Sequence, residues 1–270
     1  MKVFIHDDAD TAAAHTAAIA ARSLQRKPAA VLGLATGETM RPVYRHLRDL
    51  FAKDDIPTAD FTSFNLDEFV GVPPSHPGSF HYFMAREFLD HLGNTGTRCF
   101  LPDGMAPDVM TEAARYETSI QMHGGIDLQL LGIGRNGHIG FNEPGTAFDS
   151  RTSCIALSDQ TISTLQGFTP HLDRAALPEF AITMGIATIM DTKRCILLAT
   201  GSAKASAIRA MLEDAVSNAC PASVLRNHPD VTIILDRLAA EGLTEAGIAA
   251  FQPVFNPQVR MFHTPSDNEK

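Results

Sequence analysis

The chain has 270 residues, of which 44% are hydrophobic and 20% charged, so it can bury a substantial core and does not have the composition of a disordered protein. Its formal net charge of -9 argues against nucleic acid as the main partner, because a phosphate backbone needs a basic surface. No apolar run reaches the roughly 18 residues of a membrane span, and the N-terminal segment lacks the apolar core of a signal peptide, so we expect no membrane partner.

Apolar runs and helical patterns alternate along the chain. Strands are expected at 3–5, 30–34, 61–66, 127–133, 195–199 and 231–235, and helices at 10–25, 42–51, 79–91, 107–123 and 201–213. Short apolar runs separated by helical patterns are typical of a mostly parallel sheet with helices on both faces. The helix at 107–123 is expected to carry Arg115, Tyr116 and Glu117 on its exposed side.

The sequence contains no internal repeat and no linker rich in proline and serine. We therefore predict a single α/β domain over residues 1–270, with a loose tail from about residue 252. The four cysteines are far apart and form no CxxC pair, which favours reduced thiols and a cytoplasmic location.

A polar turn, Thr36-Gly37-Glu38-Thr39, follows the strand expected at 30–34 and precedes a helix. A strand, a glycine turn and a helix start can form an anion site, because free backbone N–H groups and the helix dipole face the ligand. The threonines add hydroxyl donors to that site. The alternative is an ordinary strand–helix turn in which a threonine caps the helix.

Asp67 follows the strand expected at 61–66, among apolar neighbours in the segment FNLDEFVGVP. Burial would raise the pKa of its carboxyl group and make it a better base at neutral pH. For a lone aspartate, the residues themselves favour the simpler interpretation of a solvated loop acid or a helix cap.

The segment LLGIGRNGHIGFNEPGT places His138 and Glu143 after the strand expected at 127–133, at the sheet edge where open α/β proteins bind ligands. A histidine and a carboxylate with Asn136 beside them can move protons at neutral pH, although a lone histidine is usually structural. The glycines also fit G-x-G-x-x-G. We reject a dinucleotide site, because that fingerprint belongs after the first strand of its unit and opens a clean helix.

Lys204 lies in the segment GSAKA, inside the first turn of the helix expected after 195–199. A lysine at a helix start suits a phosphate group, and a solvated surface lysine is the commoner alternative. The sequence has no HExxH motif, no CxxC pair and no close histidine pair, so we predict no metal site. It also has neither a nucleophile elbow nor a Walker loop.

Three segments in combination, LGLATGET, FNLDEFVGVP and GIGRNGHIGFNEPGT, make the chain resemble the glucosamine-6-phosphate deaminase (isomerase) family. The resemblance runs from about residue 3 to residue 236. The related 6-phosphogluconolactonases share the glycine–histidine loop but not the second segment or the FNEP ending of the third. The resemblance implies a modified Rossmann-like open α/β sandwich and an enzyme without a cofactor.

The resemblance also implies a reaction, the conversion of glucosamine 6-phosphate to fructose 6-phosphate and ammonia. Asp67 would take the proton from sugar carbon 2 and return it to carbon 1. His138 would open the pyranose ring, and Glu143 would orient and tune it. Position 136 is an aspartate in one branch of the family and an asparagine in another, and Asn136 matches the second. The aminosugar phosphate would be held by Thr36, Gly37, Thr39 and Lys204.

The chain departs from the family mainly at the phosphate site. Glu38 replaces a small residue, and an acid there would repel a phosphate unless it points away. Gly167 aligns with a basic residue of the family. Either Arg174 or His171 takes the place of that residue, or the phosphate is bound more weakly.

Other implications of the resemblance concern regulation and assembly. Ser153 and Ile155 replace basic residues that form an allosteric site in some relatives, so we expect no such regulation. The segment 161–165 is a lid candidate by resemblance alone. Relatives occur as monomers and as larger assemblies, so a homo-oligomer is compatible with the sequence.

Three alternatives stay open from the sequence. The first is deamination of another aminosugar, such as the galacto epimer or a sugar without phosphate. The second is a non-catalytic sugar-phosphate sensor on the same fold, which the presence of Asp67, His138 and Glu143 argues against. The third is hydrolysis of 6-phosphogluconolactone.

Overall fold

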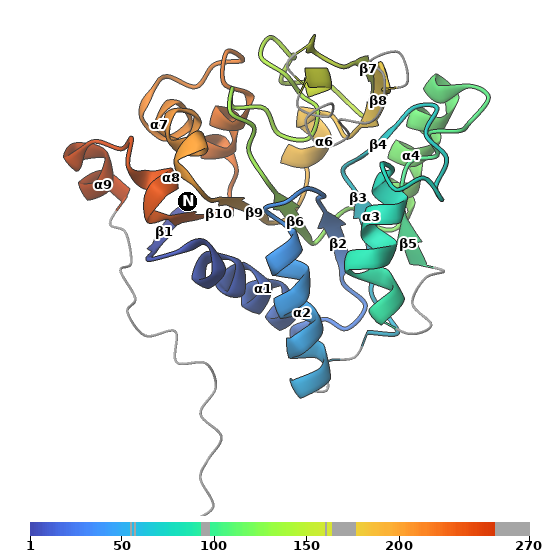
Figure 1. Ribbon diagram of the computed structural model, residues 1–270, viewed down its shortest axis with the longest axis horizontal. Coiled ribbons are helices and arrows are strands. Elements are labelled where there is room, and N and C mark those ends of the chain that lie inside the picture. The colour runs from blue at the N-terminus through green and yellow to red at the C-terminus, as the bar shows by residue number, and fades with distance from the viewer. Residues whose placement is uncertain (55, 57, 93–97, 160, 164–176, 252–270) are drawn as a thin grey trace, which may run out of the picture.

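Seven parallel strands form the centre of the protein in a computed structural model, which describes all residues except 55, 57, 93–97, 160, 164–176 and 252–270 (Figure 1). The strand order is β1-β10-β9-β6-β2-β3-β5. The strands are β1 (Lys2–His6), β2 (Val31–Leu34), β3 (Thr62–Asn65), β5 (Cys99–Phe100), β6 (Leu128–Leu131), β9 (Cys195–Ala199) and β10 (Val231–Asp236). The predicted α/β class is confirmed. The tail from residue 252 lies outside the described residues.

A second sheet of three antiparallel strands was not predicted. Its order is β4-β8-β7, with β4 at Asp67–Phe69, β7 at Ser153–Ala156 and β8 at Phe180–Thr183. It lies above the main sheet in Figure 1. Strand β4 begins two residues after β3 ends, so the chain passes directly from the parallel sheet into the antiparallel one.

The helices predicted from the sequence are present within a few residues of their expected ends. They are α1 (Ala9–Arg26), α2 (Arg41–Asp54), α3 (Phe80–Glu87), α4 (Val109–Met122) and α7 (Ala205–Glu213). The helix expected at 79–91 ends early, and a 3-10 turn at Leu89–His91 follows it. The shorter helices α6 (Ile186–Met190), α8 (Arg237–Ala240) and α9 (Glu245–Phe251) were not predicted.

Aromatic contacts show that helices cover both faces of the main sheet, as predicted. Phe61, just before β3, packs against Phe88 at the end of α3. Phe64 points to the opposite face, because side chains alternate along a strand. There it contacts Tyr116 of α4 at a ring-centroid distance of 5.6 Å.

Helix α1 begins at Ala9 because Asp8 caps it, accepting a hydrogen bond from the Thr11 N–H at 2.8 Å. Its buried stripe consists mostly of alanine, which lets neighbouring backbones approach closely. The helix packs against α2 and against β10 and β9, as Figure 1 shows for the α1–α2 pair. The stripe comprises Ala12, Ala13, Thr16, Ala17, Ala20, Ala21 and Leu24.

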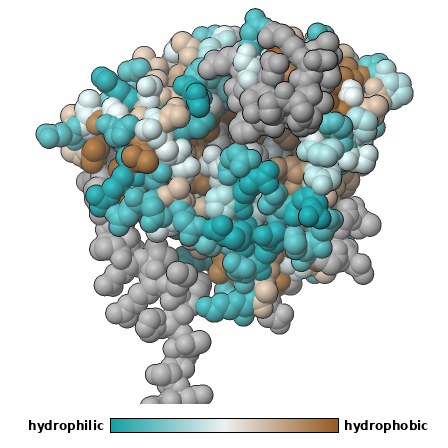
Figure 2. Space-filling model, viewed as in Figure 1, coloured by the Kyte–Doolittle hydropathy of each residue, from teal (hydrophilic) through white to brown (hydrophobic). Residues whose placement is uncertain are grey.

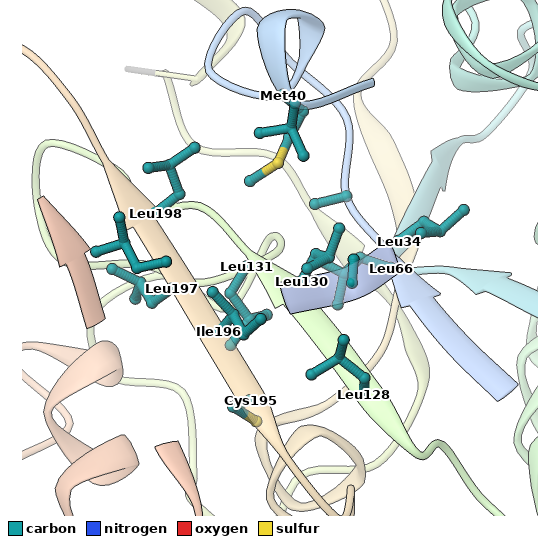
Figure 3. Close-up of a cluster of buried hydrophobic side chains, with 14 of the residues drawn as sticks. Leu34, Met40, Leu66, Leu128, Leu130, Leu131, Cys195, Ile196, Leu197 and Leu198 are labelled. Atoms are coloured by element: carbon teal, nitrogen blue, oxygen red, sulfur yellow. The ribbon is translucent and has the colours of Figure 1, made fainter. Parts of the chain in front are cut away.

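The core lies on the central strands, which are buried on both faces and are therefore mostly apolar. Figure 3 shows Leu128, Leu130 and Leu131 of β6 beside Ile196 and Leu197 of β9. Burying each of these side chains contributes about 1.5–3 kcal/mol. The central strands are thus rigid supports for the loops that leave their carboxyl ends.

The expectation that Tyr116 lies on the exposed side of its helix is wrong. Its side chain is fully buried, and its hydroxyl donates to the backbone oxygens of Asn65 and Phe100 at 2.8 and 3.0 Å. A tyrosine can replace an apolar core residue when its hydroxyl finds such acceptors.

The outer surface of α2 is polar. Figure 2 shows hydrophilic side chains, in teal, over this helix.

In the described part of the chain, no helix combines the length and the apolar character needed to cross a membrane.

Candidate active site

The four predicted site segments meet at one edge of the main sheet. They follow β9, β6, β2 and β3, which are neighbours in that order, and all four strands run parallel. Their loops therefore leave from the same, carboxyl edge, where open α/β sheets bind ligands.

Asp67 is the first residue of β4 and is only 6% exposed, which contradicts a solvated loop acid. It pairs in the sheet with Thr183, and the loop after β6 approaches it. A Cβ atom placed on Gly140 would lie 3.6 Å from Asp67 Oδ2. Among the described residues, none donates a hydrogen bond to this carboxylate. Burial, and secondarily the charge of Glu68, raise the pKa of Asp67 to about 8.

Glu68 is a buried acid that the sequence reasoning missed. Its Oε1 accepts the backbone N–H groups of Phe69 and Phe80 at 2.8 and 2.9 Å. Its Oε2 lies 2.8 Å from the His81 backbone nitrogen, which donates to it, and 2.7 Å from the His81 ring Nδ1. Glu68 thus ties the start of α3 to the strand that carries Asp67. The adjacent acids in the segment LDEF were the signal that could have indicated it.

His138, Glu143 and Asn136 form a connected group in the loop after β6, as predicted. Asn136 Nδ2 donates to Glu143 Oε2 at 2.6 Å, and Asn136 Oδ1 accepts the His138 backbone N–H at 3.3 Å. His138 Nδ1 lies 3.5 Å from the same Glu143 oxygen. Partial burial opposes ionisation of Glu143, but His138, Thr161 and Asn136 outweigh it and lower its pKa to about 2.

The glycines of this loop serve close packing rather than a dinucleotide. A Cβ atom on Gly134 would lie 2.2 Å from Cε1 of the His138 ring, so the ring sits directly over this glycine. Gly137 has a φ of 85°, and a Cβ atom there would lie 2.5 Å from Cys220 Sγ. These two positions explain the glycine spacing of the motif.

Asn142, also in this loop, has a structural role. Its Nδ2 donates to the backbone oxygens of Ile139 and Met184 at 2.8 Å each, and its side chain is buried. It thereby fastens the loop to the residue that follows β8.

The glycine turn after β2 leads directly into α2. Gly37 has a φ of 102°, and its carbonyl accepts the Met40 N–H at 2.9 Å, just before α2 begins. Glu38 pairs with α2, because Arg41 Nε donates to its Oε1 at 2.9 Å. The Glu38 side chain is 64% exposed.

Lys204 reaches from the end of β9 to the loop after β6. Its Nζ donates to the Ile133 backbone oxygen at 2.7 Å. Burial, and then the nearby charge of Arg135, lower the pKa of Lys204. An anion bound between the ends of β9 and β6 would reduce the repulsion between the positive charges of Lys204 and Arg135. Gly167, and the His171 and Arg174 side chains considered as substitutes for the family's basic residue, lie outside the described residues.

No group of three or more His, Cys, Asp or Glu side chains within the described ranges could hold a metal ion. The side chains at this edge offer acid–base chemistry. A buried carboxylate with a raised pKa can accept a proton from carbon, and a histidine beside an ionised glutamate can relay one between oxygens.

Fold and site together define an α/β protein that binds an anionic small molecule and transfers protons on it. The chain belongs to the family of glucosamine-6-phosphate isomerases and 6-phosphogluconolactonases, whose model matches residues 6–234. Glucosamine-6-phosphate deaminase of Bacillus velezensis is 45% identical over 226 residues, which cover 84% of this chain and 93% of that protein. Glucosamine-6-phosphate deaminase 1 of Bacillus subtilis is 45% identical over 224 residues, covering 83% and 92%.

Solved structures agree with this assignment. One described as a monomeric glucosamine-6-phosphate deaminase matches with a TM-score of 0.87 at 42% identity, over 90% of this chain and 100% of that chain. The 6-phosphogluconolactonase of Trypanosoma brucei matches with a TM-score of 0.70 at 20% identity, over 90% and 98%, and shows a shared fold alone.

Proposed function

We propose that the protein converts glucosamine 6-phosphate and water to fructose 6-phosphate and ammonia. The observation that carries this proposal is the buried Asp67 carboxylate, with its pKa raised to about 8, at the same sheet edge as the His138–Glu143 pair. That arrangement occurs in a chain 45% identical to a protein named for this activity.

Ring opening is the proposed task of His138. Its ring takes the proton from the anomeric hydroxyl and gives a proton to the ring oxygen, so that the bond between carbon 1 and the ring oxygen breaks and an aldehyde forms. The ionised Glu143 stabilises the positive imidazolium that exists between these two transfers. Asn136 cannot titrate and acts by holding Glu143, to which it donates at 2.6 Å.

Isomerisation is the proposed task of Asp67. Its carboxylate removes the proton from carbon 2 while a proton of the substrate's ammonium group passes to the carbon 1 oxygen, which gives an enolamine. The same carboxyl group returns its proton to carbon 1, which leaves a protonated imine at carbon 2. Water adds to that imine, and ammonia leaves as the ketone forms. The reaction needs no oxidant, because the carbon 1 aldehyde is reduced as carbon 2 is oxidised. Exclusion of water around the buried Asp67 protects the enolamine.

The 6-phosphate is proposed to bind between the glycine turn after β2 and Lys204. The turn offers backbone N–H groups at Gly37 and hydroxyl groups at Thr36 and Thr39. Lys204 supplies the charge, and its hydrogen bond to Ile133 fixes its position. We propose that the protein is cytoplasmic, because the spacing of its cysteines favours reduced thiols. We also propose that it acts on a small-molecule aminosugar phosphate.

The proposal is tested by ammonia release from the chelator-treated protein with glucosamine 6-phosphate, glucosamine and 6-phosphogluconolactone as separate substrates. We expect ammonia from the phosphorylated aminosugar only and no lactone hydrolysis. Equal turnover of glucosamine would contradict the phosphate site. Lactone hydrolysis without ammonia release would place the protein with the lactonases.

Replacing Lys204 by methionine should raise KM for glucosamine 6-phosphate by roughly ten- to hundredfold, because one charge-assisted contact to the phosphate is lost. The effect on kcat should be smaller, since the phosphate is remote from the reacting carbons. Lys53→Met, which removes an exposed lysine from the last turn of α2, is the matched control. Steady-state kinetics check this prediction, and an unchanged KM in Lys204→Met would refute the assigned role.

A further inference from the structure

Two hydroxyl groups outside the predicted motifs hold the Glu143 carboxylate. Thr161 Oγ1 donates to Glu143 Oε1 at 2.7 Å, and Ser158 Oγ lies within hydrogen-bond distance of the same oxygen at 3.1 Å. The other oxygen, Oε2, faces Asn136 at 2.6 Å and the His138 ring at 3.5 Å. The two oxygens of one carboxylate therefore have separate sets of partners.

The hydroxyl groups come from a short turn that follows β7. Ser158 caps this turn, since its Oγ accepts the Thr161 backbone N–H at 3.2 Å and its carbonyl accepts the Ile162 N–H at 2.9 Å. The two hydroxyl oxygens lie 3.0 Å apart. The cap thus fixes the position at which Thr161 presents its hydroxyl to Glu143.

This contact matters because the terminal torsion of a glutamate side chain is broad and poorly fixed by its own rotamer preferences. A carboxylate free to rotate would bring either oxygen, or neither, toward the His138 ring. A hydrogen bond from Thr161 to Oε1 restricts that rotation, and bonds to an ionised acceptor are about twice as strong as neutral ones.

We propose that Thr161, supported by Ser158, is a positioning residue for ring opening, which fixes the Glu143 carboxylate so that Oε2 faces His138. Thr161 touches neither the reacting carbons nor the ring oxygen in this scheme and acts through Glu143. The inference rests on the proposed function, because it assigns a part in the same reaction.

The test compares Thr161→Val, which keeps the shape and loses the donor, with Thr161→Ser, which keeps the donor. We expect kcat for glucosamine 6-phosphate to fall by about ten- to hundredfold in Thr161→Val, the effect of losing one hydrogen bond to a charged group. Thr161→Ser should restore most of it. Ser163→Ala is the matched control, since the Ser163 hydroxyl bonds to the Asp159 backbone oxygen in the same turn.

Two further measurements separate positioning from a general structural effect. The affinity for an acyclic substrate analogue, 2-amino-2-deoxyglucitol 6-phosphate, should be unchanged in Thr161→Val, because this ligand has no ring to open. In a Glu143→Gln background, Thr161→Val should cost much less than it does alone, because the two side chains act as one unit.

The inference is overturned if Thr161→Val keeps the wild-type kcat, or if its loss is equally large in the Glu143→Gln background. It is also overturned if the acyclic analogue binds more weakly in parallel with the fall in kcat. Absence of ammonia release by the wild-type protein would instead refute the proposed function itself, and the inference with it.

Discussion

Replacing Asp67 by asparagine is expected to lower kcat/KM for glucosamine 6-phosphate by roughly 10³-fold or more, near the upper range for loss of a general base. Asparagine has nearly the same shape and cannot accept the carbon 2 proton. The expected loss lies in kcat, because the residues proposed to bind the phosphate are unchanged. Ammonia release measures this effect, and full turnover by Asp67→Asn would show that another group removes the proton.

The same substitution should make the protein more stable at pH 8. The folded-state pKa of Asp67 is raised to about 8, whereas in an unfolded chain an aspartate has a pKa of about 4. The stability contributed by the protonated buried group is therefore complete below pH 4 and is lost as the pH rises toward 8. Asparagine carries no charge at any pH, so the gain in melting temperature should be larger at pH 8 than at pH 5.

Asp127→Asn provides a control of opposite sign. Partial burial opposes ionisation of Asp127, but Lys193, Lys27 and the Val31 N–H together lower its pKa. Its contribution to stability is present above the unfolded-state pKa and is lost at low pH. Asp127→Asn should therefore lower the melting temperature at pH 8. A lower melting temperature of Asp67→Asn at pH 8 would contradict the penalty assigned to the buried carboxylate.

Replacing His138 by glutamine should lower kcat by roughly 10²- to 10⁴-fold, the usual contribution of a positioned acid–base group. Glutamine can form hydrogen bonds but cannot exchange a proton between the anomeric hydroxyl and the ring oxygen. The acyclic analogue should still bind, because its binding requires no ring opening. His91→Gln, an exposed position outside the site, is the control. A His138→Gln variant with wild-type kcat would show that the ring opens without this histidine.

Most strands of the main sheet were predictable from their short buried runs, whereas β5, which has two residues and is only half-buried, was not predicted. The run CILLA at 195–199 contains no polar residue, and β9 begins and ends at the predicted residues. The antiparallel sheet was missed because β4, β7 and β8 are three or four residues long and show no clear alternation of polar and apolar side chains. A strand of that length is recognised by its partners, which lie far away in the sequence.

Asp67 shows the consequence of not predicting the antiparallel sheet. The residues alone favoured a solvated loop acid, because an aspartate after a strand is usually exposed. Pairing with Thr183 brings it under the loop after β6, and burial there raises its pKa. The resemblance to a family suggested a base at this position, but the physical cause depends on a contact between residues more than a hundred positions apart.

The group of Asn136, His138 and Glu143 was predictable because one short loop carries all three residues. The hydroxyl of Thr161 was not, since a threonine in a polar stretch has no distinguishing pattern. Its contact with Glu143 depends on where β7 ends and how the following turn is capped. Glu38 illustrates the same limit, because only the structure shows that its carboxylate pairs with Arg41.

The most direct test of the central claim is to follow the products of glucosamine 6-phosphate by nuclear magnetic resonance, with purified, chelator-treated protein. The account predicts fructose 6-phosphate and ammonium in equal amounts throughout the reaction, because isomerisation and loss of the amine occur on one substrate molecule. Ammonium with an aldose product, or an unchanged substrate, would contradict the proposed deamination.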